Sequence, residues 1–361
     1  MARSGWLTRA FLVGAGLGFG FAAAQRLREA DLSGQVVLVT GGSRGLGLLL
    51  AREFARQGCR IAICGRDREQ LERAGADLRR LTPEVLTVRC DVSDRSQVDG
   101  MVNQVLVRFG RIDVLVNNAG IIQVGPMQDM SLQDFEQAMN AMFWGPVYTT
   151  LAVLPAMRQR RSGRIVNITS IGGVVSVPHL LPYNAAKFAA LGFSEGLHAE
   201  AAKDGVRVTT VVPGLMRTGS QEHARFKGDA GKEYRLFAPL ASLPLIAADA
   251  ERMAHRIVTA TRRGEAEVIL SPQANLLARV HGLFPGTTSN VLGVVNRVLP
   301  GPHGPNGGAV SGREVEAQGA SRWFELITRL GRSAARRFLQ QPPEPPPVPA
   351  PGEPRPLRAS D

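Results

Sequence analysis

The side chains of Ser170, Tyr183 and Lys187 lie close together in the sequence and could together move a proton. Tyr183 and Lys187 are four residues apart, and a helix is expected to begin after Pro182, so both side chains should leave the same helical face. An ammonium group beside a phenol favours the phenolate and should lower the pKa of the tyrosine. Tyr183 is therefore a candidate proton donor or acceptor.

Ser170 follows an apolar run at residues 164–169 that is typical of a buried strand. Parallel α/β sheets bind ligands at the carboxyl ends of their strands. The Ser170 hydroxyl could hydrogen-bond a substrate carbonyl while Tyr183 protonates the same oxygen. A tyrosine and a lysine at this spacing also occur as an ordinary solvated pair on helices, so the chemical interpretation depends on the rest of the chain.

From residue 36 onward, short apolar runs alternate with amphipathic stretches, which predicts βαβ units and a parallel sheet. A long helix is expected at about 132–160. The expected strands are residues 36–40, 60–64, 85–89, 113–117, 164–169, 206–212 and 267–270. These elements predict a single α/β domain at residues 33–272.

Three glycines, Gly41, Gly45 and Gly47, lie between the first expected strand and the following helix. Gly41 permits a tight turn, Gly45 lets the backbone approach a pyrophosphate, and Gly47 lets helix and strand pack closely. Phosphates would then meet free N–H groups at the start of the helix. The placement of this trio predicts a dinucleotide site.

The second strand ends at Gly65, where sites for the unphosphorylated cofactor usually carry a carboxylate that binds the ribose. Arg66 follows, and Arg44 lies inside the glycine turn. Two guanidinium groups could therefore bind a 2′-phosphate, which favours NADP (NADPH) as the cofactor. The alternative is that both arginines are simply solvated.

Polar or small residues also follow three other strands. Asp91 and Val92 could meet an adenine edge. The backbone of Asn118, Ala119 and Gly120 could stay close to the cofactor, and the Thr218 hydroxyl could bond the nicotinamide carboxamide.

Taken in order, these motifs resemble the short-chain dehydrogenase/reductase family over residues 34–272. The resemblance is carried by Thr40-Gly-x-x-x-Gly-x-Gly47, Asp91, Asn117-Asn-Ala-Gly120, Ser170, Tyr183-x-x-x-Lys187 and Pro213-Gly214. It implies a doubly wound Rossmann fold with a seven-stranded parallel sheet in the order 3-2-1-4-5-6-7. It also implies an NAD(P)-dependent enzyme that reduces a carbonyl or oxidises an alcohol.

The resemblance implies Tyr183 as the general acid/base and Ser170 as the group that orients the substrate oxygen. Lys187 would lower the pKa of the tyrosine and hold the nicotinamide ribose. No metal site is expected. With the residues above, the expected cofactor contacts are Gly41, Ser43, Arg44, Gly45, Leu46, Gly47, Arg66, Asp91, Val92, Asn118, Ala119, Gly120, Tyr183, Lys187, Pro213, Gly214 and Thr218.

One position departs from the family pattern. Members commonly carry an asparagine three residues before a glycine of the long helix, where it holds a water behind the lysine. Here that glycine is Gly145 and the matching residue is Met142. Asn140 lies roughly 200° around the helix and cannot substitute. Proton supply is re-routed or slower, or the protein is a cofactor-binding regulator or scaffold with weak turnover.

The chain has 361 residues and a net charge of +12, which suggests attraction to an anionic membrane or to nucleic acid. Aromatic residues are few and no nucleic-acid-binding module is recognisable, so membrane attraction is favoured. Cys59, Cys64 and Cys90 show no metal-ligand or disulfide spacing, and each lies at or beside an expected strand. Reduced core cysteines and an intracellular location are expected.

Residues 1–32 contain an uncharged, glycine-rich apolar run at 11–24 flanked by arginines. A signal peptide, a membrane anchor and a poorly ordered extension all fit this pattern. Secretion would separate a cofactor enzyme from its cofactor. A membrane-contacting segment is therefore preferred, with the catalytic domain facing the cytoplasm.

The segment at 219–245 is expected to form a lid over the substrate. With the apolar residues of 174–181, it favours a small apolar carbonyl or alcohol substrate, although loop residues that merely pack on the core give the same pattern. A homodimer or homotetramer is possible.

Beyond the core domain, residues 273–300 predict an apolar helical extension and residues 301–320 a flexible linker. Residues 321–339 predict a basic amphipathic helix, with Trp323, Ile327, Leu330, Ala334 and Phe338 on one face. This helix could bind a membrane surface or pack on the protein's own core. Residues 340–361 are proline-rich and are expected to be disordered.

Overall fold

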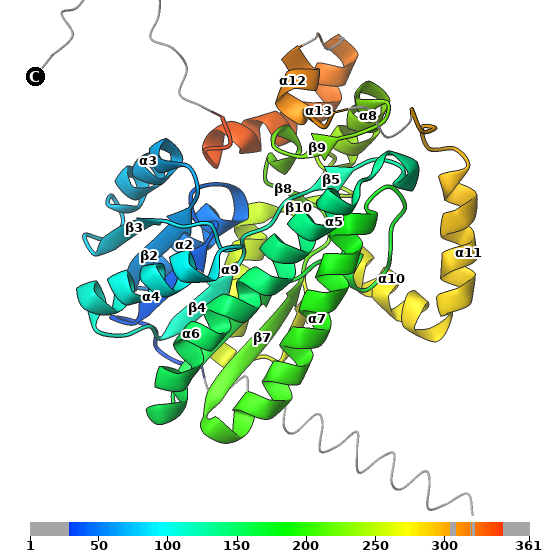
Figure 1. Ribbon diagram of the computed structural model, residues 1–361. Helices are drawn as coiled ribbons and strands as arrows, with labels where there is room; N and C mark the ends of the chain where they lie inside the picture. The colour runs from blue at the N-terminus through cyan, green and yellow to red at the C-terminus, as the bar shows by residue number, and fades with distance from the viewer. Residues whose placement is uncertain (1–28, 304–307, 318, 320–321, 342–361) are drawn as a thin grey trace, which may run out of the picture.

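The computed structural model describes residues 29–303, 308–317, 319 and 322–341 (Figure 1). Most of the expected N-terminal membrane segment, residues 1–28, and most of the proline-rich tail, residues 342–361, lie outside this range. Within the described residues, no helix combines the length and the apolarity that crossing a bilayer requires.

A seven-stranded parallel sheet forms the centre of the protein, in the order β3-β2-β1-β4-β6-β7-β11. The predicted doubly wound order is therefore confirmed. The strands are β1 (Val36–Thr40), β2 (Arg60–Gly65), β3 (Val85–Arg89), β4 (Val114–Asn117), β6 (Gly163–Ile168), β7 (Val206–Val212) and β11 (Glu267–Ile269).

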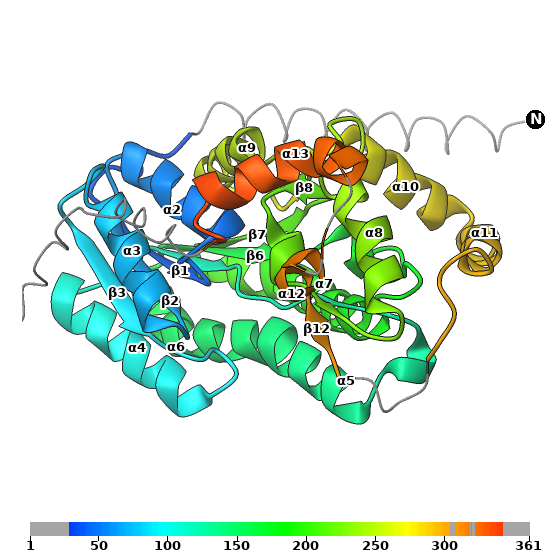
Figure 2. The same ribbon diagram turned by 90° about the horizontal axis from the view of Figure 1, so that it is seen from above.

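Helices cover both faces of the sheet, as the two views show (Figures 1 and 2). One face packs against α2 (Gly45–Arg56), α3 (Arg68–Leu78) and α9 (Ala250–Arg263). The other packs against α4 (Arg95–Phe109), α6 (Gly145–Gln159) and α7 (Leu181–Ala201). Alternate residues of β1 enter the two cores, Val37 and Val39 on one side and Val36 and Leu38 on the other. The cysteines at 59, 64 and 90 are buried free thiols.

The long helix expected at 132–160 is divided into three parts. These are α5 (Leu132–Met139), the π-helical turn η2 (Asn140–Trp144) and α6. Pro146 has no N–H to donate to the carbonyl of Met142, four residues earlier, so the regular ladder cannot continue there. The turn carries Met142 into the interior.

Beyond the main sheet, short strands join distant segments. β5 (Gln123–Val124), β9 (Arg225–Phe226) and β12 (Val310–Ser311) form a small sheet, and β8 (Met216–Arg217) pairs with β10 (Ala248–Asp249). The single-turn helices η1 (Met127–Asp129), η3 (Ile171–Gly173), η4 (Ala202–Asp204) and η5 (Ser220–Glu222) lie in loops.

The expected flexible linker at 301–320 is partly wrong. Residues 310–317 form β12 and α12 (Gly312–Ala317), because the edge of β9 pairs with β12. The hydroxyl of Tyr234 also donates to the Glu316 carboxylate at 2.9 Å. Tyr234 belongs to α8 (Ala230–Leu240), so the expected lid region shares a small apolar core with the C-terminal part of the chain.

Two helices follow β11 and stand beside the domain, at the right of both views (Figures 1 and 2). They are α10 (Pro272–Leu283) and α11 (Pro285–Asn296), within the expected apolar extension. Many of their apolar side chains are exposed, including Leu283, Phe284 and Val294.

The last described helix, α13 (Arg322–Arg337), lies across the domain beside α2 and α8 (Figure 2). Ala334 and Phe338, from the stripe considered for membrane binding, are buried against the protein instead, although Trp323 and Leu330 are exposed. Close approach is possible because Gly219 has no side chain where Ala335 packs. The alternative, packing on the protein's own core, therefore holds for the C-terminal end of this stripe, at Ala334 and Phe338.

Candidate functional site

Ser170, Tyr183 and Lys187 meet at the carboxyl end of β6 and the first turns of α7. Oγ of Ser170 accepts the N–H of Gly172 at 3.1 Å, and Ser170 lies near enough to the Tyr183 phenol to act on its pKa. A Cβ built at Gly172 would lie 3.2 Å from the Tyr183 ring and 3.5 Å from Ser170 Oγ, so glycine there leaves room for both groups. Nζ of Lys187 lies 5.8 Å from the centroid of the tyrosine ring.

The electrostatics of Tyr183 differ from the expectation. Burial raises the pKa of the phenol, and the neighbouring Ser170 acts in the opposite direction. Nζ of Lys187 donates to the carbonyl of Ile168 at 2.7 Å, and burial lowers the pKa of this lysine to about 8. The predicted lowering of the tyrosine pKa by Lys187 is therefore wrong for this arrangement, because desolvation of the phenol dominates.

The glycine turn has the geometry that its spacing predicts. Gly41 has a φ of +64°, which favours glycine. A Cβ at Gly47 would overlap the carbonyl oxygen of Gly41. Asn118 Nδ2 donates to the carbonyls of Thr40 and Gly41 at 3.0 and 3.2 Å, and Thr40 Oγ1 accepts the N–H groups of Asn118 and Ala119. These bonds hold the end of β4 against the turn.

The role of Thr40 was not assigned from the sequence, although it is part of the motif. Ser43 is buried beside Gly65, and Leu46 packs on the core shared by α2 and α9. Gly45, where α2 begins, donates its N–H to the carbonyl of Phe338 at 2.9 Å. This partner comes from the far end of the described chain.

Two arginines lie near the end of β2. Nη1 of Arg44 donates to Gln70 Oε1 at 2.5 Å, and Arg66 lies 3.9 Å from the Asp91 carboxylate. Burial is the main cause that lowers the pKa of Arg44, and the nearby positive charges of Arg66 and Arg313 act in the same direction. Two guanidinium groups therefore lie near the end of β2, where Gly65 carries no carboxylate, and the carboxylates of Asp67 and Asp91 lie nearby.

The remaining expected contacts lie at the carboxyl ends of neighbouring strands. The Asp91 carboxylate accepts the Ser93 N–H at 3.0 Å, and Val92 packs against Gly145. The Pro213 carbonyl accepts the N–H of Ile171 at 2.8 Å, which ties the β7 loop to the Ser170 loop. Two further expected contacts follow in that loop: Gly214, which lies against Ser271, and Thr218, which is buried.

Met142 is 1% exposed and packs with Ala138, Ala186 and Tyr183. A Cβ at Gly120 would lie 3.4 Å from its sulfur. The side chain that replaces the family's asparagine is therefore an apolar neighbour of the catalytic tyrosine candidate.

Sequence reasoning missed a buried pair on the substrate side. Nδ1 of His179 lies 2.6 Å from Oε1 of Glu233, which belongs to α8. His179 has a φ of +63°, and its carbonyl accepts the N–H of Gly125 at 2.8 Å. Its position between Ser170 and Tyr183 was a usable signal, but the partner lies 54 residues away along the chain.

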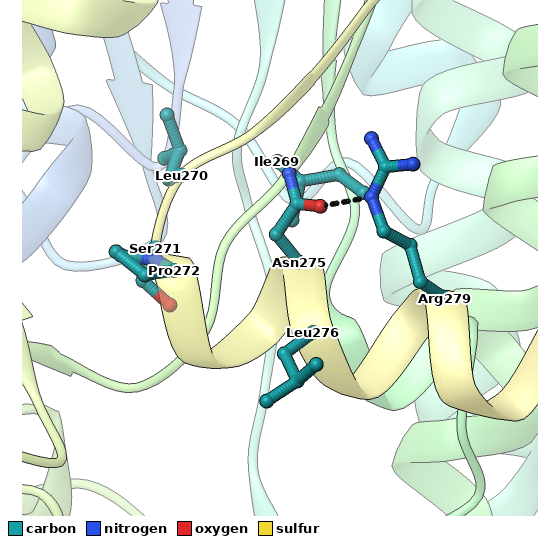
Figure 3. A pocket seen from close by; sticks show the side chains of 7 residues that line it. All are labelled: Ile269, Leu270, Ser271, Pro272, Asn275, Leu276 and Arg279. Atoms are coloured by element: carbon teal, nitrogen blue, oxygen red, sulfur yellow. Dashed lines mark hydrogen bonds between the residues drawn. The ribbon is translucent and has the colours of Figure 1, made fainter.

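An open depression of about 520 Å³ lies at the start of α10 (Figure 3). Oδ1 of Asn275 accepts from Nε of Arg279 at its rim. Its lining is Ile269, Leu270, Ser271, Pro272, Asn275, Leu276 and Arg279. None of the expected catalytic residues contributes to it.

The profile of the family described as short chain dehydrogenase matches residues 35–227. The chain belongs to the short-chain dehydrogenase/reductase family. It is an oxidoreductase that acts on alcohol or carbonyl groups, and its family binds NAD or NADP. The resemblance predicted from the motifs is thus confirmed.

A dehydrogenase/reductase SDR family protein 7-like from Anopheles gambiae is 36% identical over 248 residues, which is 67% of this chain and 77% of the relative. A short-chain dehydrogenase structure from Streptomyces avermitilis superposes with a TM-score of 0.64 at 32% identity, covering 73% of this chain and 98% of that one. An L-sorbose reductase from Gluconobacter frateurii, in complex with NADPH and L-sorbose, has a TM-score of 0.59 at 26% identity, covering 67% and 97%.

Proposed function

We propose that this protein is an NADPH-dependent oxidoreductase that reduces a carbonyl, or oxidises a secondary alcohol, on an apolar substrate. Ser170, Tyr183 and Lys187 would carry the chemistry. The observation that supports this most is that Ser170 at the strand end, the buried Tyr183 phenol and the buried Lys187 amine one helical turn further along α7 lie together.

The glycine turn fits the diphosphate of a dinucleotide, since Gly41 and Gly47 leave backbone space and α2 begins with N–H groups that lack intrahelical partners. Asn118 and Thr40 brace this turn. The cofactor, when bound, supplies or accepts the hydride.

Tyr183 would act as the acid in the reducing direction. Its pKa is raised by burial, so the phenol keeps its proton at neutral pH and can donate it to a carbonyl oxygen. Ser170 Oγ would orient the same oxygen. Lys187 uses one N–H on the Ile168 carbonyl, which leaves two for the ribose hydroxyls and for proton supply.

A preference for NADP over NAD is supported by the two arginines near the end of β2. The guanidinium groups of Arg44 and Arg66 would donate hydrogen bonds to the 2′-phosphate, and Gly65 has no carboxylate to repel it. The NADPH in the L-sorbose reductase complex supports the same choice.

An apolar substrate is supported by the residues between Ser170 and Tyr183. Val175 is buried there, and Val174, Val177 and Leu180 are half-buried. The similarity to a sugar reductase makes a polar substrate the natural competing case.

We also propose that the protein contacts a membrane surface through α10 and α11, with the catalytic domain facing the cytoplasm. Leu283 in α10 and Val294 in α11 are 73% and 60% exposed, and exposed apolar patches of this kind mark interaction sites. Replacing Leu283 and Phe284 by glutamate should reduce co-sedimentation with anionic vesicles. Val107→Glu, on the exposed face of α4, is the matched control. Equal vesicle binding by all three proteins would contradict this contact.

A homodimer or homotetramer is proposed through α6 and α7, where Leu151 and Phe188 are exposed. Light scattering of Leu151→Glu should then report a smaller particle than wild type. A wild-type monomer would contradict it.

The proposed activity is tested by following NADPH oxidation with 2-decanone, a cyclic steroid ketone and L-sorbose as substrates. We expect turnover with the apolar ketones, a lower kcat/KM with L-sorbose and a higher KM with NADH. Equal efficiency on L-sorbose and the apolar ketones would contradict the substrate class.

A cofactor-binding regulator is a second candidate, favoured by the apolar Met142 beside Tyr183. It predicts tight NADPH binding without hydride transfer to any ketone.

A further inference from the structure

The last described residues of the chain lie on the glycine turn. The Gly45 N–H donates to the Phe338 carbonyl at 2.9 Å, and Gln340 Nε2 donates to the Thr218 carbonyl at 3.1 Å. Figure 2 shows the end of α13 beside the start of α2. Residues 338–341, which we call the C-terminal strap, therefore connect two loops that are both expected to contact the cofactor.

The strap uses the same backbone space that a dinucleotide needs. A Cβ built at Gly45 would lie 2.7 Å from Gln340 Nε2, so this side chain packs directly on the glycine that must approach a diphosphate. The Gly45 N–H is also one of the first N–H groups of α2, which have no intrahelical acceptor and bind phosphate. The Phe338 carbonyl and a phosphate oxygen would compete for this donor.

The strap is fastened by side chains from several elements. The carbonyl of Gln340 accepts from His223 Nε2 and from Arg313 Nη2, each at 2.7 Å. Arg73 donates to the Gln341 carbonyl at 2.9 Å. Gln340 is only 4% exposed, so its contact with the turn is a packed one.

Other features make the strap displaceable. Leu339 has a φ of +55°, a conformation that side-chain-bearing residues rarely adopt. Gln340 Oε1 is buried without a hydrogen-bond partner among the described residues.

Arg73 and Arg313 donate to the neutral carbonyls of the strap, and Arg44 lies near enough to Arg313 for their charges to interact. The Glu222 carboxylate accepts from Gln341 Nε2 at 2.6 Å. A dinucleotide would bring phosphate charge to these arginines in place of the neutral carbonyls.

We propose that Gln340 and Gln341 of the C-terminal strap cover the phosphate position of the dinucleotide site as an internal competitor, and that these two residues must leave before the cofactor binds, while Phe338 stays in the core. The apparent affinity for NADPH is then reduced by the fraction of molecules in which the strap is closed. This inference rests on the proposed cofactor and adds a form of regulation: a partner that binds the displaced strap more tightly than the closed one activates the enzyme.

Two shortened chains and one substitution test this. A chain ending at Gln341 keeps the strap and lacks residues 342–361. A chain ending at Leu339 lacks the same residues and, in addition, Gln340 and Gln341. Both keep Phe338, which is buried in the core. Gln340→Ala in the full chain removes the packed side chain without shortening the chain.

We expect the chain ending at Leu339 and Gln340→Ala to bind NADPH about tenfold tighter or more in fluorescence titration. The chain ending at Gln341 should match the full chain. In stopped-flow mixing, the binding rate should saturate with NADPH concentration in the full chain, because strap opening limits it, and should rise linearly in the chain ending at Leu339.

Equal or weaker NADPH binding by the chain ending at Leu339 and by Gln340→Ala would overturn the strap proposal and leave the proposed cofactor intact. Failure of all four proteins to bind NADPH or NADH, with cooperative thermal unfolding retained, would instead overturn the proposed function itself, and the strap proposal with it.

Discussion

Nδ1 of His179 donates a hydrogen bond to Oε1 of Glu233 at 2.6 Å, and both side chains are buried. This bond connects the loop that precedes Tyr183 to helix α8. The segment that should cover the substrate is therefore attached to the catalytic loop by a buried polar contact.

Breaking this contact should affect substrate binding more than cofactor binding. We expect Glu233→Ala to raise the KM for an apolar ketone about tenfold, and to lower the free energy of unfolding by about 1–3 kcal/mol because His179 is left unpaired. The Kd for NADPH should stay unchanged. Steady-state kinetics and urea unfolding measure these effects, and Lys232→Ala, exposed on the same helix, is the control. An unchanged KM would argue against α8 as the substrate cover.

The buried charge of Lys187 should lower the free energy of unfolding near neutral pH. Burial lowers its pKa from 10.5 to about 8, so between these values the unfolded chain binds more protons than the folded chain. Stability therefore rises with pH across this window, and below pH 8 the full cost of about 3 kcal/mol is present. Lys187→Met loses the bond to the Ile168 carbonyl, worth about 1 kcal/mol, and should still raise the free energy of unfolding by about 2 kcal/mol at pH 7.

The gain in the free energy of unfolding of Lys187→Met should shrink as the pH is raised to 10, while turnover is lost at every pH. Urea unfolding at pH 7 and pH 10 checks it, with the exposed Lys203→Met as control. A Lys187→Met protein less stable than wild type at pH 7 would contradict the assigned burial cost.

Arg44 and Arg66 should determine the choice of cofactor. Replacing both by alanine removes charge-assisted bonds to a 2′-phosphate, each worth about 1.5–3 kcal/mol, so the KM for NADPH should rise at least about tenfold. The KM for NADH should not change. Arg68→Ala, on the exposed start of α3, is the control. An equal rise for both cofactors would mean that the arginines support the turn rather than read the phosphate.

Met142→Asn should keep turnover at or above the wild-type level, because the amide restores a polar group behind Lys187. The protein should be less stable by about 1–3 kcal/mol, since an amide replaces a side chain that is 1% exposed. Met142→Leu keeps the volume and is the control for packing. Measured kcat and thermal unfolding test this pair; complete loss of turnover in a folded Met142→Asn protein would show that the methionine has a role of its own.

Local sequence signals predicted much of this protein because the chemistry needs them locally. The glycine turn requires Gly41 and Gly47 for steric reasons, and Tyr183 and Lys187 share a helix face by spacing alone. The π-helical turn was not predicted, although Pro146, four residues after Met142, was a local signal for it.

Contacts between distant segments were not predictable in this way. Nothing near Gln340 in a proline-rich tail indicates that it packs on Gly45, and His179 finds Glu233 only after α8 has folded over it. The raised pKa of Tyr183 also depends on burial, which the spacing to Lys187 does not report.

Proton transfer by Tyr183 is tested most directly by Tyr183→Phe, which removes one hydroxyl and keeps the ring. We expect kcat for reduction of an apolar ketone by NADPH to fall about 10²–10⁴-fold while the Kd for NADPH stays the same. Tyr148→Phe, whose ring stacks on Trp144 at 6.0 Å, should retain full activity. A Tyr183→Phe protein that reduces the ketone at the wild-type rate would contradict the assignment of this phenol as the proton donor.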